Sequence, residues 1–99
     1  MSQLTSTQIK NELTNLPEWQ ESCGAIIRDF TLANFREALR FINEIGERAE
    51  AADHHPDLLL HDYRRVKVTL TTHSAGGLTV NDFALARQID ALFRQFNRA

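Results

Sequence analysis

The sequence contains few of the residues that would mark a specialised class of protein. Cys23 is its single cysteine, so no disulfide can form within the chain and no cysteine-based metal cage is possible. The formal net charge of -2 gives no electrostatic basis for general attraction to nucleic acid or to a membrane surface. No apolar run approaches the roughly 20 residues of a membrane-spanning helix. The segment from Ser2 to Thr14 is polar, unlike a signal peptide. We therefore expect a cytoplasmic protein.

The residues that are present indicate a small folded domain. The length of 99 residues is close to the commonest domain size, and 42% hydrophobic with 24% charged residues is typical of a globular protein. We find no internal repeat, low-complexity segment or linker. The sequence therefore predicts one domain over residues 1–99.

Three helices are predicted by matching start signals. Thr5, Thr31 and Thr79 are expected N-caps, each preceded by an apolar residue that can pack against another one turn later. Apolar residues at helical spacing follow each cap: Ile9, Leu13 and Leu16, then Phe35, Leu39, Ile42 and Ala49, then Leu85, Ile89, Leu92 and Phe96. The first helix should stop before Pro17 and the second should run toward Asp53.

Two strand hairpins are predicted between these helices. Residues 19–23 and 25–30 flank a turn at Gly24. Val66, Val68 and Leu70 alternate with polar residues, which is typical of a half-buried strand, and residues 63–65 are its start or a short partner. The order helix, hairpin, helix, hairpin, helix predicts an α+β fold: a small antiparallel sheet of about four strands with three helices on one face.

The most informative group is a pair of histidines in the middle of the chain. His54 and His55 stand directly before Pro56, with Glu50 and Asp53 upstream. Imidazole is the side chain best able to give and take a proton near neutral pH. Pro56 disfavours helical geometry at His55, so the second helix should end near Asp53 or His54. Glu50 and His54 are four apart and should share one face of its last turn.

A third histidine, His73, follows the alternating strand, and Asp82 comes nine residues later. Strand alternation groups His73 with the polar face rather than with the buried valines. Asp82 lies one turn into the third helix, from where we expect it to approach His73. Solvation of each histidine and helix capping by Asp82 are the alternatives that the residues leave open. His61 has no evident companion and is interpreted as a surface residue.

A zinc site is a second way to use histidines and acids, and it fits less well. Adjacent histidines diverge by roughly 100° on a helix. The spacing that places two histidines on one helical face is absent. We therefore expect no metal site.

The chain resembles the pterin-4a-carbinolamine dehydratases over about Leu4 to Phe96. The resemblance is carried by the segments EAADHHP at 50–56, Tyr63, VKVTLTTH at 66–73 and GLTVND at 77–82. The family pattern is an acid, three residues, His-His-Pro, an aromatic, a histidine after a strand, and a downstream aspartate. Many relatives carry a tryptophan shortly after the proline, where this chain has Leu58 and Leu59. The wall of the pterin pocket is therefore expected to differ.

The resemblance implies an activity and roles for these residues. The family removes water from 4a-hydroxytetrahydropterins, the products of aromatic amino-acid hydroxylases, and forms quinonoid dihydropterin without a cofactor or metal. It assigns His54 and His73 as the acid–base pair, and Asp82 as a catalytic-site acid that orients an imidazole. Matching substrate-binding positions are Glu50, Asp53, His55 and Pro56, with Glu50 also orienting a histidine.

The resemblance also implies protein partners. Family members form homodimers or homotetramers, and animal members double as dimerisation cofactors of a homeodomain transcription factor. A protein-binding module is therefore the alternative function. Phe35, Phe41 and Ile45 widen the apolar stripe of the second helix. Self-association explains this excess most simply, and we expect no direct nucleic-acid or membrane partner.

Overall fold

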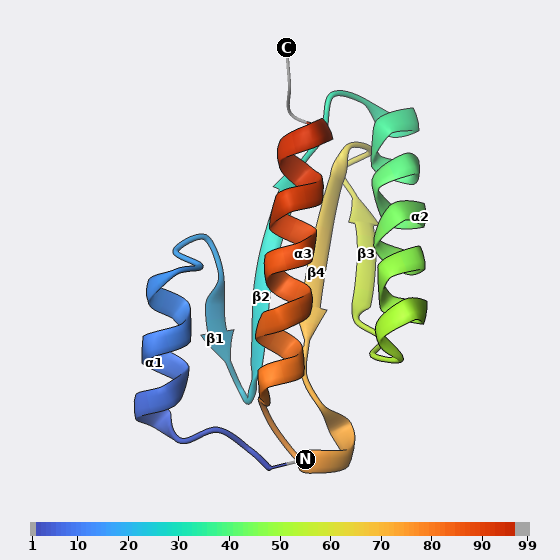
Figure 1. Ribbon diagram of the computed structural model, residues 1–99. Coiled ribbons are helices and arrows are strands. Elements are labelled where there is room, and N and C mark those ends of the chain that lie inside the picture. Colours follow the sequence, from blue (N-terminus) through green and yellow to red (C-terminus); the bar gives the residue numbers. More distant parts are fainter. Residues whose placement is uncertain (1, 97–99) are drawn as a thin grey trace.

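The computed structural model describes residues 2–96, which form helices on one antiparallel sheet (Figure 1). The elements are α1 (Ser6–Thr14), β1 (Gln20–Ser22), β2 (Ala25–Thr31), α2 (Phe35–Ala52), β3 (Asp57–His61), β4 (Arg65–Leu70), the short 3₁₀ helix η1 (His73–Ala75) and α3 (Val80–Phe96). The strand order is β1-β2-β4-β3. The predicted α+β fold is confirmed. Across the described residues, no helix is long and apolar enough to cross a membrane.

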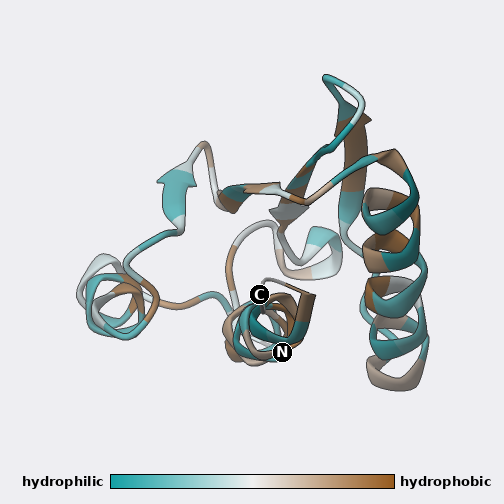
Figure 2. Ribbon diagram, turned by 90° about the horizontal axis from the view of Figure 1, so that it is seen from above, coloured by the Kyte–Doolittle hydropathy of each residue, from teal (hydrophilic) through white to brown (hydrophobic). Residues whose placement is uncertain are grey.

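The helices lie on one side of the sheet (Figure 2). The apolar side chains on that side of the sheet are buried in a common core with those of the helices. Strand alternation sends every second residue of β4 into this core, namely Val66, Val68 and Leu70, all at 0% exposure. Phe41 and Ile45 of α2 and Phe83 of α3 meet them and are equally buried. The core thereby fixes how the start of α3 and the end of α2 lie against the same sheet.

The helix starts are set by local hydrogen bonds, and one differs from the prediction. Thr5 and Gln8 form the expected capping box of α1. Asn34, not Thr31, caps α2, because its side chain accepts a hydrogen bond from the Glu37 amide at 2.9 Å. Thr31 is still part of β2, where it pairs with Arg65. The prediction of Thr31 as a cap was therefore wrong by three residues.

The first hairpin is as predicted, whereas the second begins earlier in the chain. Cys23 and Gly24 have φ angles of 52° and 78°, which suit the two-residue turn between β1 and β2. β3 pairs with β4 through Leu58 opposite Val68 and Leu60 opposite Val66. Tyr63 lies in the turn between these strands, so its assignment to a strand was wrong. β3 was not predicted, because its three consecutive leucines at 58–60 lack the alternation of apolar and polar residues that indicates a strand.

The end of α2 is a turn that reverses the chain toward β3. Asp53 adopts left-handed geometry with φ 50° and ψ 44°. Its amide donates to the Glu50 carbonyl at 3.2 Å, and the His54 amide donates to the Ala49 carbonyl at 3.0 Å. This pair of bonds is the Schellman motif, which satisfies the last carbonyls of a helix. The predicted helix end near Asp53 or His54 is confirmed, and the motif sets the direction in which His54 leaves the helix.

Candidate active site

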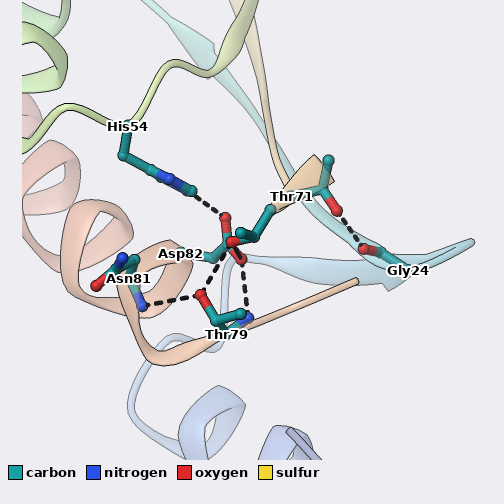
Figure 3. Close-up of polar contacts among 7 residues, drawn as sticks. Gly24, His54, Thr71, Thr79, Asn81 and Asp82 are labelled. Carbon is teal, nitrogen blue, oxygen red and sulfur yellow. Dashed lines mark hydrogen bonds and ion pairs between the residues drawn. The ribbon is translucent and has the colours of Figure 1, made fainter. Parts of the chain in front are cut away.

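His54 and Asp82 meet beneath the sheet, although 28 positions separate them in sequence. The Nε2 atom of His54 lies 2.6 Å from Oδ1 of Asp82. Figure 3 shows His54 reaching from the segment after α2 toward Asp82 at the start of α3. The Asp82 side chain is 0% exposed and that of His54 is 11% exposed. The contact is therefore shielded from water.

The other carboxylate oxygen of Asp82 accepts two hydrogen bonds. Its Oδ2 accepts from the Thr72 hydroxyl at 2.8 Å and from the Thr79 amide at 2.9 Å. The second of these bonds confirms the predicted capping role of Asp82 in α3. The Thr79 amide can only donate, and as a carboxylate Asp82 accepts from the Thr72 hydroxyl and from His54 as well. A buried carboxylate needs such partners, and here it has three.

This arrangement leaves one ring nitrogen of His54, Nδ1, for proton transfer. With Asp82 accepting, Nε2 must be the protonated nitrogen, and Nδ1 then holds the lone pair of the neutral ring. Within residues 2–96 the hydrogen bonds of His54 use its amide and Nε2. The side chain keeps 11% exposure, and Nδ1 is the ring nitrogen that Asp82 does not contact. His54 can therefore exchange a proton through Nδ1 while Asp82 holds its other edge.

The second histidine of the pair lies in a different environment. His55 is hydrogen-bonded through Nε2 to Oε2 of Glu50, and its side chain is 58% exposed. We expected Glu50 to face His54, and this was wrong. His54 leaves the helix after the left-handed Asp53, so the four-residue spacing of a continuous helix does not apply to it. Glu50 instead contacts His55, the residue after His54, whose side chain lies beside the end of α2.

His73 is exposed and belongs to a short closed loop rather than to the strand. β4 ends at Leu70, and His73 begins η1. Thr72 and Gly77 pair across the base of this loop, with Thr72 N to Gly77 O at 3.1 Å and Gly77 N to Thr72 O at 3.3 Å. Within the described range, no hydrogen bond ties the His73 side chain. The prediction that Asp82 approaches His73 was wrong, because Asp82 turns inward to His54.

The remaining predicted positions, Asp53 and Pro56, border the histidine pair. Asp53 is exposed, and what the structure assigns to it is the left-handed backbone geometry at the end of α2. Pro56 is half-buried and directly precedes β3. Their part in binding a substrate stays a prediction.

Thr72 and Thr79 are functional candidates that the sequence reading missed. Their hydroxyls lie 2.9 Å apart, and both residues contact Asp82. The signal for Thr72 was present, because the alternation of Val66, Val68 and Leu70 extends to position 72 and places this threonine on the buried side. A buried threonine needs a hydrogen-bond partner, and the nearby buried acid supplies it.

His61 also has a partner that was not expected. Its Nε2 lies 2.9 Å from Oδ2 of Asp29, and the same oxygen forms an ion pair with Arg65 at 3.1 Å. The contact joins β3 to β2 across β4, so it depends on the strand order and has no signature in the sequence. His61 is therefore half-buried and paired, away from the His54 contact.

Residues 2–96 contain no group of three or more side chains placed to hold a metal ion. A surface hollow is lined by Glu37, Arg40, Gln95 and Phe96, at the other end of α2 from His54. The histidines do not line it. The arrangement around His54 is suited to proton transfer by an oriented imidazole.

Comparisons with known proteins agree with one another. The family model described as pterin 4 alpha carbinolamine dehydratase matches residues 2–92. A protein of Picosynechococcus sp. provisionally named pterin-4-alpha-carbinolamine dehydratase is 50% identical over 91 residues, covering 92% of this chain and 98% of that protein. A Chloroflexus aurantiacus protein with the same provisional name is 46% identical, covering 93% of this chain and 98% of its own length.

Two solved structures are also similar. The crystal structure of a transcriptional coactivator/pterin dehydratase from Brucella melitensis superposes with a TM-score of 0.87 and 36% identity, covering 92% of this chain and 98% of that one. A pterin dehydratase-like RuBisCO assembly factor of the alpha-carboxysome gives a TM-score of 0.61 at 20% identity, covering 75% of this chain and 84% of its own. The second likeness shows the fold alone.

Proposed function

Because the chain belongs to the pterin 4 alpha carbinolamine dehydratase family, we propose that it removes water from a 4a-hydroxytetrahydropterin. The product is a quinonoid dihydropterin, and the reaction recycles the pterin cofactor of an aromatic amino-acid hydroxylase. The enzyme is then a hydro-lyase that works by histidine acid–base catalysis. The contact between His54 and the buried Asp82 is the observation that carries this proposal.

The chemistry requires one proton donor and one proton acceptor. The bond from C4a to oxygen breaks, and the hydroxyl leaves as water once it receives a proton. A ring nitrogen of the pterin loses a proton as the new double bond forms. No net proton is consumed, so one protonated and one unprotonated group of the protein, both in contact with the substrate, are sufficient. A positioned general acid or base typically contributes 10²–10⁴-fold to a rate.

We assign proton transfer at His54 to its Nδ1 atom. Nε2 is occupied by Asp82, which keeps the ring in one orientation and stabilises the imidazolium when Nδ1 is protonated. Asp82 is fully buried, so it acts through His54 and not on the pterin itself. His73 is the second acid–base group in this proposal, and its exposure on η1 leaves it open to a substrate.

The rim of the proposed site consists of the predicted binding residues. His55 and Glu50 are hydrogen-bonded to each other and exposed, so both retain unused polar atoms for a pterin. Asp53 and Pro56 flank the two histidines in the same short segment. These four residues are proposed to bind the substrate, and neither a metal nor a cofactor has a part in the proposal.

The decisive experiment follows the dehydration of freshly generated 4a-hydroxytetrahydropterin by absorbance. His54→Ala and His73→Ala should each lose about 10²–10⁴-fold in kcat while circular dichroism shows an intact fold. His61→Ala is the matched control, because this histidine is paired with Asp29 and should leave the rate unchanged. A wild-type protein without activity above the uncatalysed reaction would refute the assignment.

We also infer that the protein self-associates through the outer face of α2. Phe35 and Leu39 are four residues apart on this helix, and they are 50% and 43% exposed. Phe41 and Ile45, which we expected in this excess, are fully buried and belong to the core. A protein-binding role toward another partner would use the same two side chains and is the alternative function. A homodimer or homotetramer, and a cytoplasmic location, stay predictions.

A further inference from the structure

We propose that Thr72 is a positioning residue for both proposed acid–base histidines, His54 and His73. This inference rests on the proposed function. Its side chain fixes the acid behind His54, and its backbone closes the loop that carries His73. No substrate contact is assigned to Thr72 itself.

The side chain of Thr72 is part of an ordered set of donors. Its hydroxyl proton goes to Oδ2 of Asp82 at 2.8 Å, so the Thr79 hydroxyl, 2.9 Å away, must donate to the Thr72 oxygen. The Thr79 oxygen in turn accepts from the Asn81 amide at 3.3 Å. The donors therefore point in one direction, from the first turn of α3 through two hydroxyls to the carboxylate. Figure 3 shows the contacts of His54 and Thr79 with Asp82 and that of Asn81 with Thr79.

The consequence for His54 follows from the geometry of a carboxylate. A carboxylate oxygen held by a single donor leaves the group freer to rotate about its terminal bond, whereas two donors, the Thr72 hydroxyl and the Thr79 amide, hold Oδ2 of Asp82. Oδ1 is then fixed toward Nε2 of His54. Removal of the Thr72 hydroxyl leaves one donor on Oδ2, and the orientation of Oδ1 becomes less restricted. The protonated nitrogen of the ring is then less strictly Nε2.

The backbone of Thr72 acts on the other histidine. Its amide and carbonyl pair with Gly77, and its carbonyl also accepts from the Ala75 amide at 3.1 Å. These bonds close the loop of residues 73–76, in which His73 is the first residue. One residue therefore ties the loop of His73 to the acid that orients His54. A valine at position 72 keeps the backbone bonds and removes only the hydroxyl.

The test compares Thr72→Val, Thr72→Cys and Thr72→Ser with the matched control Thr71→Val. Thr71 is adjacent and its hydroxyl donates to the Gly24 carbonyl at 2.7 Å, so the control loses a half-buried hydroxyl that does not touch Asp82. The readouts are kcat and KM for dehydration, the melting temperature, and the imidazole ¹⁵N shifts of His54 by NMR, which distinguish Nε2–H from Nδ1–H.

We expect Thr72→Val to lower kcat about tenfold, near the lower end of the effect of one hydrogen bond to a charged group, with KM within about twofold of wild type. The kcat of Thr72→Ser should stay within about threefold of wild type. Cysteine is a weak donor, so the kcat of Thr72→Cys should lie between those of the serine and valine variants, and this variant replaces Thr72→Val if the latter does not fold. The ¹⁵N shifts of His54 should show a mixture of tautomers in Thr72→Val and Thr72→Cys, and a single tautomer in wild type, Thr72→Ser and Thr71→Val. Thr71→Val should lower the melting temperature without changing kcat or these shifts.

Two results would overturn the inference: unchanged kcat and His54 shifts in Thr72→Val, or an equal loss of kcat in Thr72→Ser and Thr72→Val. The NMR readout does not require turnover. If the wild type has no dehydratase activity while Thr72→Val still changes the His54 tautomer, the positioning role stands and the proposed function fails.

Discussion

Asp82 Oδ1 lies 2.6 Å from Nε2 of His54, and this contact joins the start of α3 to the segment that leaves α2. It makes the acid a partner of the first histidine in the pair, while Glu50 serves the second. Two adjacent histidines are thus differentiated by their partners, one shielded and one exposed. Separate roles for them follow from this difference, and each can be tested by substitution.

Asp82→Asn should lower kcat by about ten- to a hundredfold. The amide has one acceptor oxygen in place of two, so it cannot serve both His54 and the donors from Thr72 and Thr79. An unmet hydrogen bond at this fully buried position should also reduce the free energy of unfolding by about 1–3 kcal/mol. Steady-state kinetics and urea unfolding measure the two effects. Full activity in a folded Asp82→Asn protein would remove Asp82 from the mechanism.

Asp90→Asn is the matched variant in the same helix and should affect stability alone. Asp90 accepts from Nε1 of Trp19 and from Arg28, both at 2.9 Å, and ties α3 to β2. The Arg28 guanidinium also lies 4.3 Å from the ring centre of Phe30. We expect a loss of about 1–3 kcal/mol in the free energy of unfolding with kcat unchanged. A kcat that falls as far as in Asp82→Asn would mean that destabilisation, not orientation of His54, explains both.

Asp53→Gly separates the backbone role of this residue from its predicted contact with substrate. Glycine adopts left-handed geometry without penalty, so the variant should keep or gain up to about 1 kcal/mol in unfolding free energy. Loss of the carboxylate should raise KM several-fold with little change in kcat, if Asp53 binds the pterin. An unchanged KM would mean that Asp53 has no part in substrate binding and that its role is confined to the backbone turn that ends α2. Asp53→Val, which strains the same turn, should destabilise by about 1–2 kcal/mol.

Phe35→Glu with Leu39→Glu should convert an oligomer into a monomer. A charge on each exposed position would have to be desolvated in any interface built on this face of α2. Size-exclusion chromatography with light scattering reports the mass of wild type and variant. Val80→Glu is a control, because Val80 is 50% exposed at the start of α3 and outside the proposed interface. A wild type that is monomeric at micromolar concentration would contradict self-association.

The local signals in the sequence were sufficient for most of the architecture. The capping box of Thr5 and Gln8, the turn at Gly24 and the end of α2 before Pro56 each depend on residues a few positions apart. Such features act through short-range hydrogen bonds and backbone sterics, so the chain specifies them without reference to the rest of the fold. β3 was missed because Leu58, Leu59 and Leu60 are all apolar, and periodicity cannot orient such a run.

The sequence by itself determined the candidates for chemistry: the histidine pair, His73 and the acids near them, together with the family they resemble. Only the tertiary structure decided which acid serves which histidine. Asp82 meets His54 because the core packs α2 and α3 on the same sheet, and Thr72 joins them because the alternation of β4 continues past the end of the strand and turns this residue inward. Sequence spacing carries no information on contacts across 28 residues, since these are set by packing and by the need to satisfy a buried carboxylate.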